Sequence, residues 1–327
     1  MRRKDFLKGA GAFVLAAPAL AVPHLARAQG TFPDKPIRMV IPFAPGGTTD
    51  LLARAVGQHM SQVWGQPVVA DNRPGANGVI AGEIVAKSAG DGYTLSMVAM
   101  GHATNPLIYK NLPYDGEDDF TAISLMATFP QLVLVNPGVE AATLSEFIAL
   151  ARSASPPLTY ASGGNGSSQH LAGALFAKMA GLTMTHVPYK GGNPAQLDLI
   201  AGNVDMMITQ LNSKDLITSG KLRALAVSSA RRSRYYPQLP TVAEAGAKGY
   251  QSLAWYGLIG PKDMPSELVD KIAAEAKRAV DTEAVKSVIA QQGGDVVAST
   301  PQEFEDFIDS EHKRYAAIVR EAGMAID

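Results

Sequence analysis

The 327-residue chain contains no cysteine, so it has no disulfide framework, no thiolate nucleophile and no zinc–sulfur site. It also carries little charge, because Asp, Glu, Lys and Arg make up only 18% of its residues. Five basic residues and one acidic residue lie among the first 28, which leaves 24 bases against 29 acids and a net charge of −5 beyond them. Such a chain has no basic surface to neutralise phosphates, so we expect no nucleic-acid partner.

Motifs of catalysis and cofactor binding are also missing. The sequence has no G-x-S-x-G elbow, no G-x-x-x-x-G-K-[ST] phosphate loop, no complete G-x-G-x-x-G fingerprint and no H-E-x-x-H pair. We therefore expect no cofactor, no metal and no enzymatic activity. A hydrolase built on Ser168, His170 and Asp205 stays open as an alternative, although the expected sequence around its nucleophile is absent.

The first 28 residues have the form of an export signal. Residues 2–8 read R-R-x-x-F-L-K, residues 10–22 are small and apolar, and residues 26–28 form an A-x-A cleavage site. Pro18 interrupts the apolar stretch, which is shorter than the roughly 20 residues that span a bilayer. The sequence predicts a twin-arginine signal peptide over 1–28, cleavage after Ala28 and a periplasmic product.

Strand-like and helix-like segments alternate beyond that point. We expect strands over 37–43, 68–71, 93–100, 121–135, 158–161, 186–188, 204–209, 222–228 and 252–260. We expect helices over 51–63, 79–88, 144–153, 170–180, 194–202, 265–281, 283–292 and 301–323. This alternation predicts an α/β fold with a parallel sheet and helices on both of its faces.

Two long extended segments, 121–136 and 252–260, look like crossings between lobes. A chain that leaves one sheet, builds a second and returns forms a discontinuous first domain. We expect lobe 1 to hold 29–128 and 252–327, and lobe 2 to hold 129–251.

Three loops between an expected strand and an expected helix are rich in glycine and hydroxyl groups: residues 44–50 (APGGTTD), 162–170 (SGGNGSSQH) and 189–193 (YKGGN). Ligands of open α/β sheets bind beyond the carboxyl ends of the strands. The helix that follows such a loop offers unpaired N–H groups and a partial positive charge, which suit a carboxylate without any cation. One loop belongs to lobe 1 and two to lobe 2, which suits a ligand with two anionic ends.

The roles of several side chains near these loops have two interpretations. His170 is either a ligand contact or a residue that starts its helix, and Asp50 is either a ligand contact or a helix-terminal charge. An aspartate in the local setting of Asp205 is more often a residue between a loop and a strand than a binding group. Trp255 and Tyr256 are either a wall of the cleft or buried packing at the hinge.

The segments FPDKPIRMVIPFAPGGTTD, DNRPGANGVIAGEIVAKSAGDGYT, GGNGSSQHLAGALF, HVPYKGGNPAQLDLIAGNVDMM and WYGLIGP span almost all of the chain beyond its signal. In this order they resemble the Bug-type substrate-binding proteins of tripartite tricarboxylate transporters. The resemblance implies a two-lobed periplasmic-binding-protein fold (type II, Venus-flytrap) with its ligand in the interlobe cleft. It also implies a carboxylate held mostly by backbone amides, hydroxyl groups and waters.

The resemblance and the loops together give a set of candidate ligand-binding residues. They are Phe43, Ala44, Gly46, Gly47, Thr48, Asp50, His102, Thr104, Ser162, Gly164, Asn165, Gly166, Ser167, Ser168, His170 and Asp205. The implied function is that of a monomer that captures a di- or tricarboxylate, an amino acid or an aromatic acid and meets membrane permease subunits transiently. A sensor that presents its bound ligand to a signalling partner is the alternative.

Overall fold

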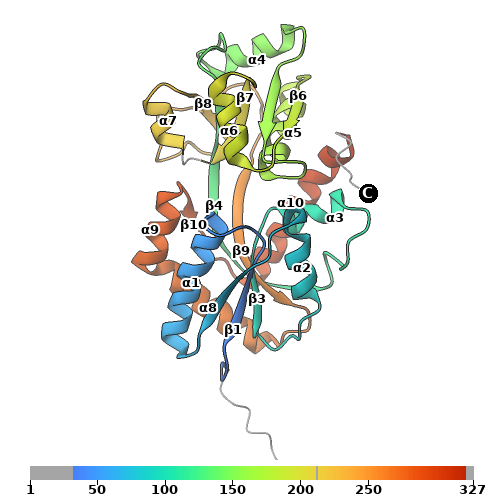
Figure 1. Cartoon of the computed structure of the whole chain (residues 1–327), viewed down its shortest axis with the longest axis vertical. Coiled ribbons are helices and arrows are strands. Elements are labelled where there is room, and N and C mark those ends of the chain that lie inside the picture. The colour runs from blue at the N-terminus through green and yellow to red at the C-terminus, as the bar shows by residue number, and fades with distance from the viewer. Residues whose placement is uncertain (1–31, 211–212, 322–327) are drawn as a thin grey trace, which may run out of the picture.

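The structure is a computed structural model that describes residues 32–210 and 213–321. Figure 1 shows two lobes joined by two long strands, β4 (Phe120–Val135) and β9 (Leu253–Pro261). The expected signal peptide (1–28) and the end of the expected last helix (301–323) lie outside the described residues.

The sheet of lobe 1 is mixed. Its strands run in the order β2, β1, β3, β9, β4, with β10 also paired to β4. Their bounds are Ile37–Ile41 for β1, Val68–Asn72 for β2, Thr94–Ala99 for β3 and Asp295–Val296 for β10. β1 pairs in parallel with β2 and β3, whereas β9 is antiparallel to both β3 and β4. The expectation of a parallel sheet is therefore wrong at the two strands that carry the chain between the lobes in opposite directions.

β4 also belongs to the sheet of lobe 2. Its residues 120–130 pair with β9, and its residues 131–135 pair antiparallel with β7 and β8. Beyond β7, strands β5 and β6 continue the sheet in parallel. Their bounds are Thr159–Ser162 for β5, Thr185–Pro188 for β6, Met206–Gln210 for β7 and Arg223–Val227 for β8. A single strand thus ties the two sheets together.

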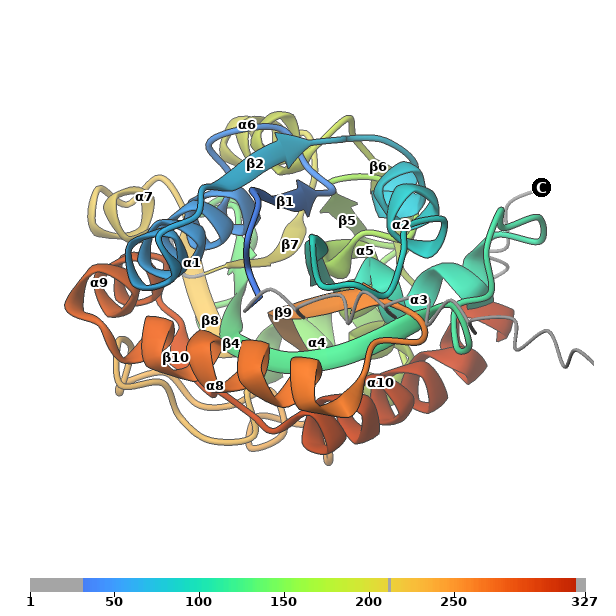
Figure 2. The same ribbon diagram turned by 90° about the horizontal axis from the view of Figure 1, so that it is seen from below.

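Helices cover both faces of each sheet. In lobe 1 they are α1 (Thr48–Trp64), the 3-10 turn η1 (Ala76–Gly78), α2 (Val79–Ala86), α3 (Gly101–Ile108), α8 (Ser266–Asp281), α9 (Glu283–Gln291) and α10 (Pro301–Glu321). In lobe 2 they are α4 (Leu144–Ser153), α5 (Ser168–Ala180), α6 (Gly192–Ala201) and α7 (Lys214–Thr218). Seen from below in Figure 2, α1 and α9 lie to the left of the lobe 1 sheet, and α2 and α3 lie to its right.

Alternation along β1 explains how its two faces are covered. Ile37, Met39 and Ile41 share one face because side chains of a strand alternate, and they join the core that contains residues of α1, α8 and α9. Val40 points to the other face and packs with Ala81 and Val85 of α2. The alternation of side chains along β1 therefore determines which helices pack on each of its faces.

The largest core runs from one lobe into the other. It includes Trp255 of β9 and Ile318 of α10 together with Phe147 and Phe176 of lobe 2. The last turn of α10 also meets α5, where Lys178 Nζ lies 2.7 Å from Glu321 Oε2. On the α10 side the lobes are thus joined by continuous apolar packing, so a relative rotation of the lobes must pivot there.

The candidates His102 and Thr104 lie in the short helix α3, which contains Pro106 in its interior. Pro106 has no N–H to bond back along the helix, so local preference disfavours a helix here. Long-range contacts override this preference, since α3 packs along α10 and Ile108 lies in the interlobe core.

Gly257 is the tightest point of the packing between β9 and α10. A Cβ atom at this position would lie 2.1 Å from Cζ of Phe304, whose side chain is fully buried. We expect Gly257→Ala to lower the free energy of unfolding by about 1–3 kcal/mol, because crowding a packed core forces neighbouring side chains to shift. Denaturant unfolding checks this, with Gly47→Ala as the control, since a Cβ at Gly47 would meet nothing nearer than 3.9 Å. Equal unfolding midpoints for the two variants would contradict the expectation.

Candidate functional site

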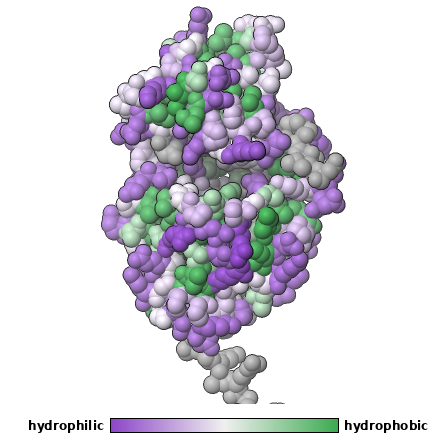
Figure 3. Space-filling view, in the orientation of Figure 1, coloured by the Kyte–Doolittle hydropathy of each residue, from purple (hydrophilic) through white to green (hydrophobic). Residues whose placement is uncertain are grey.

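The carboxyl ends of the parallel strands in both lobes point at the waist of the molecule. In lobe 1, Ala99 at the end of β3 pairs with Tyr256, close to where β9 enters the lobe. In lobe 2, Gln210 at the end of β7 pairs with Gln131, close to where β4 enters. The space-filling view shows a hollow between the lobes at this level (Figure 3). The loops that follow these strands therefore surround one cleft.

Asp50 shapes the loop that leads from β1 to α1. Its carboxylate accepts hydrogen bonds from Gly46 N at 2.9 Å, from Arg54 Nε at 2.9 Å and from Asn72 Nδ2 at 2.9 Å. Burial alone would raise the pKa of Asp50, but the hydrogen bonds from Arg54, Gly46 and Asn72 outweigh it and hold the pKa below its usual value. With 3% of its surface exposed, this anion fixes the loop.

The first turn of α1 offers donors to the cleft. Gly47 is the N-terminal cap residue, and within the described residues no side chain caps this helix. The first N–H groups of a helix have no partner inside it. The Gly46 amide is already bonded to Asp50, but Gly47 is exposed and Thr48 is half-buried, so the amides of these two residues can meet a ligand. The helix dipole adds a partial positive charge at the same point.

The loop that leads from β5 to α5 uses most of its own amides. Gly163 N donates to Gln169 Oε1, Gly164 N to Ser162 Oγ, Gly166 N to His170 Nδ1 and Ser167 N to the Gly164 carbonyl. Ser167 Oγ in turn accepts from His170 N and caps α5. The N–H groups of Ser168 and Gln169 in the first turn remain, as does the Ser168 hydroxyl, which has no partner in the described part of the chain. Lobe 2 therefore offers fewer donors than its glycines suggest.

Gln169 holds the two loops of lobe 2 together. Its Oε1 accepts from Gly163 N at 2.7 Å, and its Nε2 donates to Thr209 Oγ1 on β7 at 3.1 Å. The third loop joins through Gly191 N, which donates to the Gly163 carbonyl at 3.2 Å. A Cβ at Gly192 would lie 3.0 Å from Gln169 Nε2, so a larger residue there would crowd the Gln169 amide.

Two stacked imidazole rings support the loop that leads from β5 to α5. The rings of His170 and His186 lie 3.7 Å apart and are nearly parallel, and His186 Nε2 is 2.7 Å from Ser162 Oγ. Desolvation, with a smaller contribution from His186, lowers the pKa of His170 to about 3. Desolvation lowers the pKa of His186 to about 4. Both rings are therefore neutral at neutral pH.

Because the pKa values of these two histidines are low in the folded protein, we expect the protein to lose stability in mild acid. The unfolded chain binds their protons near the ordinary pKa of 6.5, whereas the folded chain binds them only near 3 and 4. Stability is therefore fully present above about pH 6.5 and falls as the pH drops toward 4, by at most about 1.4 kcal/mol per pH unit for each histidine. Chemical unfolding at several pH values measures the slope, and His186→Gln should make it shallower. An unchanged slope in that variant would count against this assignment.

Polar contacts join the two lobes across the cleft. Thr48 Oγ1 of lobe 1 lies 3.4 Å from Gln210 Oε1 of lobe 2, and Gln210 Nε2 donates to Tyr256 OH at 2.8 Å. Asn77 Nδ2 of lobe 1 donates to the Gly166 carbonyl of lobe 2 at 3.2 Å. The structure is thus a form in which the rims of the two lobes already meet.

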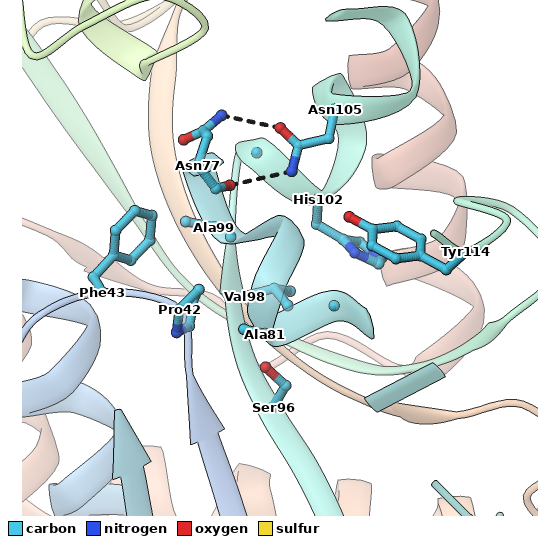
Figure 4. A pocket seen from close by; sticks show the side chains of 13 residues that line it. Pro42, Phe43, Asn77, Ala81, Ser96, Val98, Ala99, His102, Asn105 and Tyr114 are labelled. Carbon is cyan, nitrogen blue, oxygen red and sulfur yellow. Dashed lines mark hydrogen bonds between the residues drawn. The ribbon is translucent and has the colours of Figure 1, made fainter. Parts of the chain in front are cut away.

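A small cavity opens beside Asn77 within lobe 1. Figure 4 shows Phe43 on one side of it, Asn77 and Asn105 at the top, and His102 and Tyr114 on the other side. Its volume of about 20 Å³ has room for roughly one water molecule. It cannot hold a whole dicarboxylate, but it can take a small substituent of a ligand that lies in the cleft.

The structure separates the sequence candidates into two groups. The first group lies on the loops at the cleft and holds Phe43, Ala44, Gly46, Gly47, Thr48, Gly164, Asn165, Gly166, Ser167 and Ser168. The members of the second group make contacts inside their own lobes, and they are Asp50, His102, Thr104, Ser162, His170 and Asp205. Ligand contact by members of the first group stays a prediction.

The Asp205 carboxylate makes its hydrogen bonds away from the cleft, so ligand contact by Asp205 stays a prediction that the geometry does not support. Asp205 precedes β7, at the end of the sheet farthest from the cleft, and its carboxylate accepts from Thr159 N at 2.7 Å and from Thr159 Oγ1 at 2.8 Å. Ligands bind beyond the carboxyl ends of strands, and this residue stands before the amino end of one. Asp205 ties β7 to β5.

Five further candidates make contacts inside their own lobes, and ligand contact by them stays a prediction. Asp50, Ser162 and His170 make the loop-supporting contacts described above. Thr104 is fully buried and donates to the Met100 carbonyl. The His102 ring packs edge-on against Phe120 at 4.9 Å, and desolvation lowers its pKa to about 4.

The hydrolase arrangement is not assembled. His170 Nδ1 accepts from a backbone amide, and Asp205 lies at the far end of the sheet, so neither serves Ser168 as base and orienting acid. Over residues 32–210 and 213–321, no group of three His, Cys, Asp or Glu side chains is placed to hold a metal ion. No helix in that part of the chain is long and apolar enough to cross a membrane.

Sequence reasoning missed four residues that shape the cleft: Asn77, Gln169, Gln210 and Tyr256 as a polar partner. Asn77 stands in the turn that follows β2 and Gln210 ends β7, so both follow carboxyl ends of strands. The rule that ligands bind beyond the carboxyl ends of strands could have identified Asn77 and Gln210 from the sequence. The sequence offers no comparable signal for the bonds of Gln169.

Comparisons with known proteins agree with this geometry. Residues 52–324 match the family described as the tripartite tricarboxylate transporter family receptor. BugT of Bordetella pertussis is 35% identical over 296 residues, which cover 90% of this chain and 91% of BugT.

Solved structures of similar proteins also match this chain over most of its length. An R. palustris protein with adipate has a TM-score of 0.79 and 35% identity, over 90% of this chain and 99% of that one. MatC from Rhodopseudomonas palustris with bound malate has a TM-score of 0.75 and 31% identity, over 88% of this chain and all of that one, 100%. The predicted two-lobed binding-protein fold is confirmed. The chain therefore belongs to the tripartite tricarboxylate transporter receptor family, whose members are solute-binding receptors.

Proposed function

We propose that the protein captures a small carboxylate in the interlobe cleft, in the periplasm, and delivers it to the permease subunits of a tripartite transporter. The observation that carries this proposal is the pair of helix N-termini that meet at the cleft. The uncapped first turn of α1 belongs to lobe 1, and the first turn of α5 belongs to lobe 2. Each offers N–H donors and a partial positive charge to an anion.

The charges around the cleft support the same ligand class. The three loops contain a single cation, Lys190, which is exposed. Asp50, the acid nearest to the α1 turn, is neutralised by Arg54, with Oδ1 and Nε 2.9 Å apart. The relatives named above hold adipate and malate, which are both dicarboxylates. We infer a small mono- or dicarboxylate that is bound by neutral donors.

Closure of the lobes follows from their connections. β4 and β9 cross between the lobes, and the apolar core joins the lobes on the α10 side. We propose that the lobes rotate about this side and that the contacts of Thr48 and Asn77 across the cleft form when a ligand is bound. Small-angle scattering should show a smaller radius of gyration with ligand than without.

A thermal-shift screen tests the proposed function. Small carboxylic acids are compared with their own methyl esters and primary amides, which keep the carbon skeleton but lose the charge. A ligand that binds only the folded protein at 100 times its Kd stabilises it by about 2.7 kcal/mol, so at least one acid should raise the melting temperature clearly. The matching ester and amide should not. A screen in which no acid shifts the melting temperature, or in which the neutral forms shift it equally, would overturn the proposal.

Export is the second part of the proposal. Intact-mass measurement of periplasmic protein should give a chain that begins at Gln29. A product that keeps Met1, or none in the periplasm, would contradict it.

A further inference from the structure

Asn77 holds a backbone conformation that side chains other than glycine rarely adopt. Its φ of 51° lies in the left-handed region, in a turn between two glycines that also have positive φ, Gly75 and Gly78. Asparagine tolerates this region better than most residues, but strained positions persist only where surrounding contacts enforce them. They cluster at functional sites, so the contacts of Asn77 are informative.

Those contacts hold the Asn77 carboxamide from two sides. Asn77 Nδ2 donates to Asn105 Oδ1 at 3.1 Å and to the Gly166 carbonyl at 3.2 Å, and Asn105 Nδ2 donates back to the Asn77 carbonyl at 3.1 Å. A backbone carbonyl can only accept a hydrogen bond. The atom that faces Gly166 must therefore be the nitrogen, and this fixes which way the amide is turned.

The oxygen of the same amide is left without a partner. Asn77 Oδ1 accepts no hydrogen bond from any residue in the described ranges, and Figure 4 shows it on the side away from Asn105, toward Phe43. Asn77 lines the small cavity, and so do Pro42, Phe43 and Val98. Ser96, which also lines it, already donates its hydroxyl to the Val40 carbonyl at 3.0 Å. Beside the apolar walls of the cavity, Asn77 thus presents an acceptor that no group in residues 32–210 and 213–321 satisfies.

We infer that the ligand carries a small hydrogen-bond donor, a hydroxyl or an ammonium group, next to its carboxyl group, and that Asn77 Oδ1 is the acceptor that selects for it. This inference rests on the proposed function. The donor must be close to the carboxylate because Asn77 contacts Gly166, on the loop that opens α5. It must be small because the cavity has a volume of about 20 Å³. An acid without the donor leaves a partly buried acceptor unpaired, and sites built to hydrogen-bond a substrate group reject analogues that lack it.

Matched pairs of acids test the inference. Calorimetry compares succinate with L-malate and L-aspartate, propionate with L-lactate and L-alanine, and phenylacetate with mandelate, whichever pair the protein binds. The substituted acid should bind at least about 10-fold more tightly to the natural chain. Asn77→Gly should reduce this preference to within about 3-fold, because glycine keeps the left-handed backbone and removes only the carboxamide.

Ala76→Gly is the matched control. Ala76 has a φ of 45° in the same turn and is exposed, so this variant changes backbone freedom there without touching the acceptor, and the preference should remain. Equal binding of both members of each pair, or a preference that survives in Asn77→Gly, would overturn the inference and leave the proposed function standing. Binding of neither member of any pair, with no acid active in the thermal-shift screen, would overturn both.

Discussion

Replacing Gly47 with aspartate should abolish carboxylate binding and leave the protein as stable as before. Gly47 caps α1 with an ordinary φ of −80°, and a Cβ there would meet nothing nearer than 3.9 Å, so the new side chain fits. Aspartate is a preferred cap residue and its carboxylate would accept from the N–H groups of the first turn. The helix would gain at most a few tenths of a kcal/mol over glycine. The ligand, however, would find its donors occupied by an anion of the protein itself.

The size of the effect follows from the donors lost. Two hydrogen bonds to a charged acceptor, at about 1.5 kcal/mol each, correspond to more than about a 100-fold loss in affinity, before any charge repulsion. Calorimetry measures the affinity and thermal unfolding measures the stability. Gly47→Ala should bind normally, and Gly47→Asn, a neutral cap, should lie between the two. Normal binding by the aspartate variant would show that α1 does not hold the carboxylate.

Replacing Gly166 with valine should prevent closure of the cleft. Gly166 has a φ of 73°, and a Cβ there would lie 2.9 Å from Ile108 Cδ1 on the opposite lobe. The lobes of this variant cannot approach as closely as they do here, so the donors of α1 and α5 cannot reach one ligand together. We expect affinity to fall more than about 100-fold, the loss of roughly 3 kcal/mol of binding free energy. The decrease in radius of gyration on adding ligand should also disappear.

Gly181→Val controls for backbone strain. Gly181 ends the same helix, α5, with a φ of 63°, and a Cβ atom at this position would meet nothing within 4 Å. Both variants force a branched residue into the left-handed region, which costs about 1–2 kcal/mol of stability. Only the Gly166 variant should lose binding. If both lose it, strain in α5 and not closure is responsible.

Local pattern predicted the location of the loops at the cleft but not the contacts of their side chains. The loops of Gly46 and Gly166 could be placed because parallel strands share an edge for their carboxyl ends. The same rule does not favour Asp205 as a contact, since this residue precedes its strand, and only the resemblance placed it near the ligand. Gln169 was missed because its partners, Gly163 and Thr209, become its neighbours only when three elements pack together.

The mixed sheet has a similar cause. β4 and β9 look like any other strands in sequence, and only the two crossings between lobes set them antiparallel. Asp50 and His170 illustrate the limit for charged and polar residues. Each stands at the start of a helix beside glycines, where supporting the loop and touching the ligand require the same residue types. Both side chains are buried and support their loops in the structure, and the sequence does not reveal this burial.

A crystal structure of the complex with the acid that shifts the melting temperature most would test the central claim directly. The account predicts carboxylate oxygens within about 3.2 Å of N–H groups in the first turn of α1 and of a donor at the start of α5, so that both lobes hold one ligand. It also predicts that Lys190 makes no ion pair with the carboxylate. A Lys or Arg nitrogen within about 4 Å of the carboxylate, or a ligand held by one lobe alone, would contradict it.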